Sequence, residues 1–201
     1  MTDLHGDGTD GAGGTDGAGG RPAIRRIASR VVYENPWMVV REDEIERLDG
    51  SRGIYGVIDK PDFVLVIPEE DGGFHLVEEF RYPIGRRTWS FPQGAAPGRQ
   101  VVEPAELARR ELAEETGFTA GRLRRIGRLN CAHGMSGQGF TIFHATALTP
   151  GEPDREAEEQ DMRQRWVSRA EFRELVAGGL ITDDSTLAAF ALLTMDGPPA
   201  D

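Results

Sequence analysis

The sequence has 201 residues, of which 34 are acidic and 23 basic, giving a formal net charge of -11. This length fits one domain of ordinary size plus a tail, and the negative charge argues against a grip on a nucleic-acid backbone or an anionic membrane surface. No apolar run is long enough to span a membrane, and the only cysteine, Cys131, excludes an intrachain disulfide, so we expect a cytoplasmic protein with neither nucleic-acid nor membrane partners.

The first segment, residues 1–22, is rich in glycine and contains TDGAGG twice. Eight of its first twenty residues are glycine, and Leu4 is the only large apolar residue after the initial methionine. Burial cannot offset the entropy of ordering such a segment. We therefore predict a disordered tail over residues 1–22.

The next segment, residues 23–60, alternates apolar and polar residues in three stretches that end at Asn-Pro, Asp-Gly and Asp-Lys-Pro. This pattern predicts three antiparallel strands with one covered face, over residues 26–35, 37–50 and 52–59. A sheet this small is marginal when it stands alone.

A hairpin is predicted over residues 62–82, turning at Asp71-Gly72-Gly73, and residues 64–67 are apolar enough to be buried on both sides. Residues 88–102 are predicted to form a loop because of their proline and glycine content.

The first convincing helix begins near Pro104. Glu103 and Glu106 complement its positive end, and Gly117 suits a left-handed C-terminal cap. The elements predicted after it are strands at 122–130, 139–148 and 163–168, an acidic loop at 151–161, and helices at 169–177 and 182–193. Strands mixed with a few helices, without strict alternation, indicate an α+β fold on a mixed sheet.

Three glutamates, Glu111, Glu114 and Glu115, occupy the last turn and a half of the helix that begins at Pro104. Carboxylates are disfavoured there by the helix dipole, and like charges four residues apart cost about 0.2–0.5 kcal/mol. One interpretation is a solvated acidic face shared with Arg109 and Arg110. The other is a divalent-cation site, because magnesium prefers a few carboxylate oxygens and takes water and phosphates for the rest. Spacing alone does not decide between them.

The stretch GAAPGRQVVEPAELARRELAEETGF, residues 94–118, resembles the Nudix signature. Its second half is complete, from Arg110 and Glu111 to Gly117 and Phe118. The first half departs from the signature because the distance from Gly94 to Arg110 is two residues longer than usual. Counted from either end, the earlier glutamate of the signature is replaced by Val102 or Gln100, and Glu103 is adjacent.

The resemblance extends from about residue 31 to residue 195 and is to the ADP-ribose pyrophosphatase branch of the family. In that branch the usual forms of two motifs are QYRYP and WELPAG, and here they are EFRYP and WSFPQG, with Ser90 in place of a common glutamate. The change at Ser90 bears on base and sugar specificity more than on the chemistry.

The resemblance implies a Nudix fold, an α/β/α sandwich with a mixed sheet between helices, over residues 61–201. It also implies that residues 23–60 form a dimerisation segment and that the protein is a homodimer. The activity implied is hydrolysis of the pyrophosphate bond of a nucleoside diphosphate linked to a sugar, with ADP-ribose giving AMP and ribose 5-phosphate. Mg²⁺ is the expected cofactor, with Mn²⁺ as a substitute, because the metal screens the diphosphate and activates water.

Residue by residue, the resemblance implies a metal site and a catalytic apparatus. The metal ligands are the backbone carbonyl of Gln93 and the carboxylates of Glu111, Glu114 and Glu115, and Arg110 orients these glutamates. The catalytic group accordingly includes Arg110, Glu114 and Glu115, with a general base from the late acidic loop, where Glu158 and Glu159 are the leading candidates.

The implied substrate-binding residues are Trp37, Arg81, Gly94 and Gln138. Gly94 lets the backbone approach the metal because it has no side chain. Arg81 holds a phosphate by a forked contact. Trp37 is a candidate for stacking on a base, with packing in the core or at an interface as the alternative. Gln138 lies in a loop on the substrate side.

Two other functions stay open. One keeps the fold and acts on another nucleotide sugar or on a dinucleotide. The other is a nucleotide-sensing domain with little turnover, which the irregular first half of the signature and Ser90 favour and the complete glutamate cluster disfavours.

Overall fold

The computed structural model describes residues 22–155 and 161–195. Almost all of the tail predicted at 1–22, and both candidate bases, Glu158 and Glu159, therefore lie outside the described residues. No helix in the part of the chain that the structure describes is long and apolar enough to cross a membrane.

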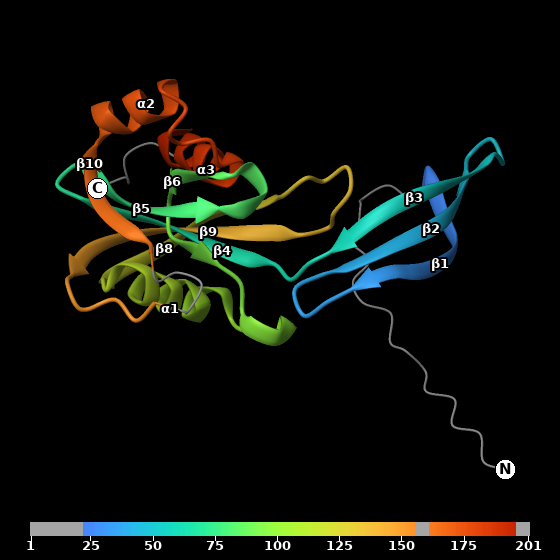
Figure 1. Ribbon diagram of the computed structural model, residues 1–201, viewed down its shortest axis with the longest axis horizontal. Helices are drawn as coiled ribbons and strands as arrows, with labels where there is room; N and C mark the ends of the chain where they lie inside the picture. The colour runs from blue at the N-terminus through green and yellow to red at the C-terminus, as the bar shows by residue number, and fades with distance from the viewer. Residues whose placement is uncertain (1–21, 156–160, 196–201) are drawn as a thin grey trace, which may run out of the picture.

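Two β-sheets organise the chain (Figure 1). The three-stranded sheet comprises β1 (Ile24–Glu34), β2 (Val39–Arg47) and β3 (Arg52–Asp59). The seven-stranded sheet comprises β4 (Phe63–Glu70), β5 (Gly73–Arg81), β6 (Arg86–Ser90), β7 (Gln93–Gly94), β8 (Thr119–Asn130), β9 (Gly139–Thr149) and β10 (Arg163–Ser168). The helices are α1 (Pro104–Thr116), α2 (Arg169–Ala177) and α3 (Asp184–Met195), with 3-10 turns η1 (Tyr82–Ile84) and η2 (Pro97–Arg99).

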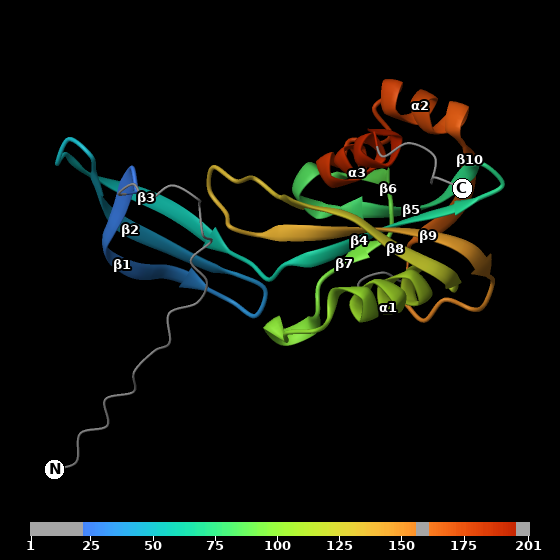
Figure 2. The same ribbon diagram turned by 180° about the vertical axis from the view of Figure 1, so that it is seen from behind.

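The larger sheet is mixed, as predicted. Its main order is β10-β5-β4-β9-β8, with β6 paired to β5 and β7 paired to β4. Strands β4 and β9 pair in parallel, and the other strand pairs described in this sheet are antiparallel. Helix α1 covers one face, and α2 and α3 cover the other (Figures 1 and 2).

Strand β4 is buried on both faces, which confirms the prediction for residues 64–67. Leu65 and Ile67 pack in a cluster with residues of α2 and α3, whereas Val64 and Val66 pack in a second cluster with residues of α1. All four are at most 1% exposed. The alternation of a strand sends successive side chains to opposite faces, so one apolar strand supplies both halves of the core.

Helix α1 begins and ends as its sequence predicts. The Glu103 side chain caps its first turn by accepting a hydrogen bond from the Glu106 N–H at 3.0 Å. At the other end Gly117 has φ 75° and its N–H donates to the Ala113 carbonyl at 2.8 Å. The acid that lies nearest to the missing glutamate of the signature is therefore the helix cap.

Several predicted boundaries are wrong. Strand β8 begins at Thr119 and not at residue 122, and residues 93–94 of the predicted loop form β7. Residues 88–90 belong to β6, because pairing with β5, Val77 opposite Ser90, supplies backbone partners that local composition does not reveal. Helix α3 begins at Asp184 instead of residue 182, because the Asp183 carboxylate accepts from the Thr186 N–H at 2.8 Å and ends the preceding segment.

The N-terminal sheet has the three antiparallel strands that were predicted, but within the described residues 22–155 and 161–195 only part of one face, around Asp43 and Ile45, is covered. Every residue of β1 except Ile27 is exposed. The register places Tyr33 and Ile54, which are 55% and 68% exposed, on one face, opposite to the buried Asp43 and Ile45.

The N-terminal sheet stands beside the larger unit and contacts its loop between β8 and β9 (Figures 1 and 2). The Tyr55 hydroxyl donates to the Gly134 carbonyl at 2.7 Å, and the Ile58 N–H donates to the Met135 carbonyl at 2.8 Å. These bonds hold β3 against a loop that was predicted to lie on the substrate side.

Candidate active site

The three glutamates of α1 differ in burial. Glu111 and Glu115, one turn apart, are 7% and 3% exposed, whereas the Glu114 side chain is 29% exposed. Glu111 and Glu115 therefore do not form a solvated acidic face. Their burial requires neighbouring groups that offset their charge, since a buried carboxylate is costly on its own.

Gly94 lies against Glu111. A Cβ atom added at residue 94 would lie 2.1 Å from Glu111 Oε2, which is closer than two non-bonded atoms can approach. The pairing of Gly94 with Val64 fixes this segment as β7. The backbone beside Gly94 also reaches Glu115, because the Gln93 N–H donates to Glu115 Oε1 at 3.3 Å. The loop backbone and the acidic side of α1 are thus in direct contact.

Arg110 lies within ion-pair range of two of the glutamates. Its Nη2 is 3.9 Å from Glu111 Oε1, and its Nε is 3.7 Å from Glu114 Oε1. These distances suit a guanidinium that orients both carboxylates without a tight fork. The neighbouring Arg109 instead donates to the Ala105 carbonyl at 3.2 Å, on the exposed side of the helix.

The residues at this place fit a divalent cation of the magnesium type. In residues 22–155 and 161–195 no three His, Cys, Asp or Glu side chains gather closely enough to form a complete ligand set. Magnesium does not need such a set, because it binds through one or two carboxylates and keeps water or phosphate oxygens for the rest. Two buried carboxylates beside a main-chain segment that only glycine allows provide that arrangement.

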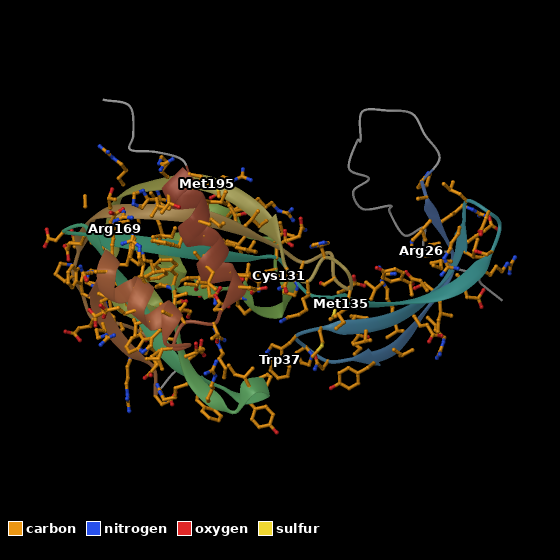
Figure 3. All side chains as sticks on the ribbon, turned by 90° about the horizontal axis from the view of Figure 1, so that it is seen from above. Arg26, Trp37, Cys131, Met135, Arg169 and Met195 are labelled. Carbon is orange, nitrogen blue, oxygen red and sulfur yellow. The ribbon has the colours of Figure 1, made fainter. Side chains whose placement is uncertain are left out.

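A cavity of about 610 Å³ opens beside Gly94. Its lining includes Gln93 and all four predicted substrate-binding residues, Trp37, Arg81, Gly94 and Gln138. Trp37 is 68% exposed and lies with Cys131 and Met135 at the junction of the two sheets (Figure 3). The fold therefore brings together residues from four separate parts of the sequence. A second cavity of about 530 Å³ adjoins it at Lys60, Pro61 and Ala96.

The polar side chains of the cavity are held by neighbours. Arg81 Nη2 lies 2.6 Å from Glu79 Oε1. Gln138 Nε2 donates to the Pro61 carbonyl at 2.7 Å. Burial raises the pKa of the Glu79 carboxyl, and Arg81 opposes the rise. The Arg81 guanidinium, which lines the cavity, is therefore already paired with the Glu79 carboxylate.

Sequence reasoning missed several lining residues. Lys60, the only lysine of the chain, lines the cavity, and its rarity was the one signal available. Asp183 lines it as well and accepts from Gln93 Nε2 at 3.3 Å. Cys131 also lines it, but burial raises the pKa of its thiol, so it is not an activated nucleophile.

The segment that contains Glu158 and Glu159 is outside the described residues, but its flanks are placed. Arg155 donates from Nε to the Glu115 carbonyl at 3.3 Å and from Nη1 to the Met162 carbonyl at 2.6 Å. Both flanks are therefore tied to the end of α1 that carries the glutamates.

Two family models match the chain. The NUDIX domain matches residues 59–190, and the nucleoside diphosphate sugar hydrolase N-terminal domain matches residues 24–58. The second match coincides with the three-stranded sheet, and the first covers the larger sheet and its helices.

Similar proteins of known name agree with these matches. An ADP-ribose pyrophosphatase of Mycobacterium tuberculosis is 29% identical over 81% of this chain and 79% of its own length. An ADP-ribose pyrophosphatase of Bacillus subtilis is 28% identical over 85% of this chain and 92% of its own length. A CMP-5'-(N-acetyl-N-hydroxy-3-aminopropyl)phosphonate hydrolase of Streptomyces rubellomurinus is 25% identical over 84% of this chain and 81% of its own length.

The fold is that of a solved structure, a crystal structure of ADP compounds hydrolase. The TM-score is 0.77, with 89% of this chain and 96% of that chain covered. The identity is 21%, so the likeness bears on the fold alone.

Proposed function

The chain belongs to the NUDIX domain family, and from that premise we propose that it hydrolyses the pyrophosphate bond of a nucleoside diphosphate linked to a sugar. The substrate proposed first is ADP-ribose, with AMP and ribose 5-phosphate as products. Two relatives that bear the name ADP-ribose pyrophosphatase, each similar over more than four fifths of this chain, support the choice.

The observation that carries the proposal is the contact of the Gln93-Gly94 backbone with the acidic side of α1. The Gln93 N–H lies 3.3 Å from Glu115 Oε1, and the missing Cβ of Gly94 leaves room for Glu111 Oε2. Gln93 and Gly94 also line the cavity that Arg81 lines. A diphosphate in this cavity would contact the Arg81 guanidinium and the Gln93-Gly94 backbone, and that backbone touches both buried carboxylates.

Glu111 and Glu115 would hold Mg²⁺, or Mn²⁺ in its place, together with the Gln93 carbonyl and Glu114. Bound there, the cation would screen the charge of the diphosphate and lower the pKa of the attacking water. Arg110 orients the carboxylates from 3.9 Å and 3.7 Å.

Arg81 would hold a phosphate through its guanidinium, which presents paired N–H donors. Glu158 or Glu159 would accept the proton of the attacking water. Trp37 offers a flat, 68% exposed ring for a base to stack on. Gln138 would line the same side, since its amide nitrogen is fixed to the Pro61 carbonyl.

A second candidate substrate is another nucleotide sugar, a dinucleotide or a related nucleotide conjugate. Ser90 favours it, because this fully buried residue replaces the usual glutamate, and so does the relative named as a hydrolase of a CMP-linked phosphonate. A nucleotide sensor with little turnover is the remaining alternative.

A substrate panel tests the assignment. Purified protein is incubated with Mg²⁺ and with ADP-ribose, other nucleotide sugars, dinucleotides or CMP conjugates, and the products are identified by mass. Preferred release of AMP and ribose 5-phosphate supports the proposal. Preference for another member corrects the substrate, and binding without turnover on any member favours the sensor.

We also propose a homodimer built through the N-terminal sheet and a cytoplasmic location. The exposed apolar residues Tyr33 and Ile54, on one face of that sheet, support the dimer.

A further inference from the structure

Glu79 and Arg81 form an ion pair at the wall of the cavity. They are two residues apart on β5, so their side chains leave the same face of the strand. Arg81 Nη2 lies 2.6 Å from Glu79 Oε1, and the two side chains are 40% and 19% exposed. Arg81 lines the cavity, whereas Glu79, on the same strand, does not.

The surroundings of Glu79 make Arg81 its principal counterion. The pKa of the Glu79 carboxyl is raised first by burial, and Asp161 and Asp183 add to the rise, while Arg81 and Arg87 oppose it. Arg87 donates from Nε to Glu78 Oε2 at 2.9 Å and forms an ion pair with Asp161.

Thr88, opposite Glu79 on β6, cannot serve as a donor to it, because its hydroxyl donates to the Leu180 carbonyl at 2.9 Å. A partly buried pair of this kind contributes little to stability, since desolvation offsets the attraction. Its presence at the cavity wall therefore calls for another role.

We propose that Glu79 is a positioning residue that holds one edge of the Arg81 guanidinium so that its remaining N–H groups face the cavity and bind a substrate phosphate. A guanidinium has five N–H donors in a rigid fork, so one edge can be fixed while another stays available. This inference rests on the proposed function, in which Arg81 binds a phosphate.

The acceptor oxygen of Glu79, and not its charge, performs this role. A glutamine carbonyl at this position can accept the same hydrogen bond without carrying a charge. Glutamine at this position should therefore keep the orientation of Arg81, whereas alanine should lose it.

A double-mutant cycle tests the inference through binding. The dissociation constant of ADP is measured by calorimetry in EDTA for wild type, Glu79→Ala, Glu79→Gln, Arg81→Ala and the pair Glu79→Ala with Arg81→Ala. Glu171→Ala, which removes a comparable acid 3.2 Å from Arg165, is the matched control. Thermal denaturation checks that each variant is folded.

We expect Glu79→Ala to weaken ADP binding about tenfold, or about 1.4 kcal/mol, and to change it less than twofold when Arg81 is already alanine. Glu79→Gln should stay within about threefold of wild type. In turnover, Glu79→Ala should raise KM more than it lowers kcat.

Three results would overturn the inference: no measurable ADP binding by wild type, an equal effect of Glu79→Ala with and without Arg81, or a glutamine variant as weak as alanine. These readouts need no turnover. A protein that binds ADP with this coupling but cleaves no diphosphate would overturn the proposed function and leave the inference standing.

Discussion

Gly94 and Glu111 are packed so closely that a Cβ atom at residue 94 would lie 2.1 Å from Glu111 Oε2. Gly94→Ala must therefore push the carboxylate of Glu111 away from its present place. Because small misplacements at a reacting centre are costly, kcat should fall about 100-fold while the fold is retained. Steady-state kinetics and circular dichroism measure the two effects. Gly56→Ala is the control, since a Cβ at Gly56 meets nothing within 4 Å, and equal kinetics for both variants would contradict the account.

Arg110 should act on the metal through the glutamates. Arg110→Gln removes the guanidinium that lies 3.9 Å from Glu111 and 3.7 Å from Glu114, so the affinity for Mn²⁺ should fall about 10–100-fold. Calorimetry with Mn²⁺ measures this directly. Arg109→Gln removes the neighbouring exposed charge, whose guanidinium donates to the Ala105 carbonyl, and should leave the affinity unchanged. A similar loss in both variants would show that net charge matters and position does not.

A general base should come from the late acidic loop. Either Glu158→Gln or Glu159→Gln should lower kcat by about 10²–10⁴-fold at saturating substrate and remove the acidic limb of the pH–rate profile. Glu152→Gln, an exposed acid before the same segment, is the control. Full activity in both test variants would assign the proton transfer elsewhere.

Glu79 should make the protein less stable as the pH rises. Burial raises the pKa of this carboxyl above its ordinary value of 4.5, so its contribution to stability is present below that pH and is lost as the pH rises through the folded-state pKa. Glu79→Gln should therefore be more stable than wild type at pH 7, and the difference should shrink toward pH 4.5. Urea unfolding at several pH values measures it, and a difference that grows on acidification would refute the sign.

The N-terminal sheet should mediate self-association. Sedimentation equilibrium should give twice the chain mass of 22.0 kDa. Ile54→Asp places a charge on the face of this sheet that also carries Tyr33, and should shift the protein toward the monomer. Leu48→Asp, equally exposed but at the turn between β2 and β3, should not. A monomeric wild type would remove the proposed dimer.

The local features that the sequence predicted well are those set by neighbouring residues. Helix α1 is an example, because Glu103 and Gly117 supply its caps within the segment itself. The apolar run at residues 64–67 is another, since uninterrupted burial needs no knowledge of the partner strand. Strand β6 was missed because its partner, β5, supplies the hydrogen bonds that define it.

The sequence predicted the part of the candidate site that lies within one motif. It did not predict the residues that the fold brings to the site from distant segments. Gly94 and the glutamates of α1 stand in one stretch of sequence. Lys60 and Asp183 come to the same cavity from distant segments, and no spacing in the sequence relates them.

The proposed hydrolysis depends on a metal ion held by the buried carboxylates of α1. The measurement that tests it most directly is the rate of AMP release from ADP-ribose with and without Mg²⁺, for wild type and Glu115→Gln. The account predicts release by wild type only with the metal, and a fall of at least about 100-fold in the variant. Metal-independent release, or a Glu115→Gln variant as active as wild type, would contradict it.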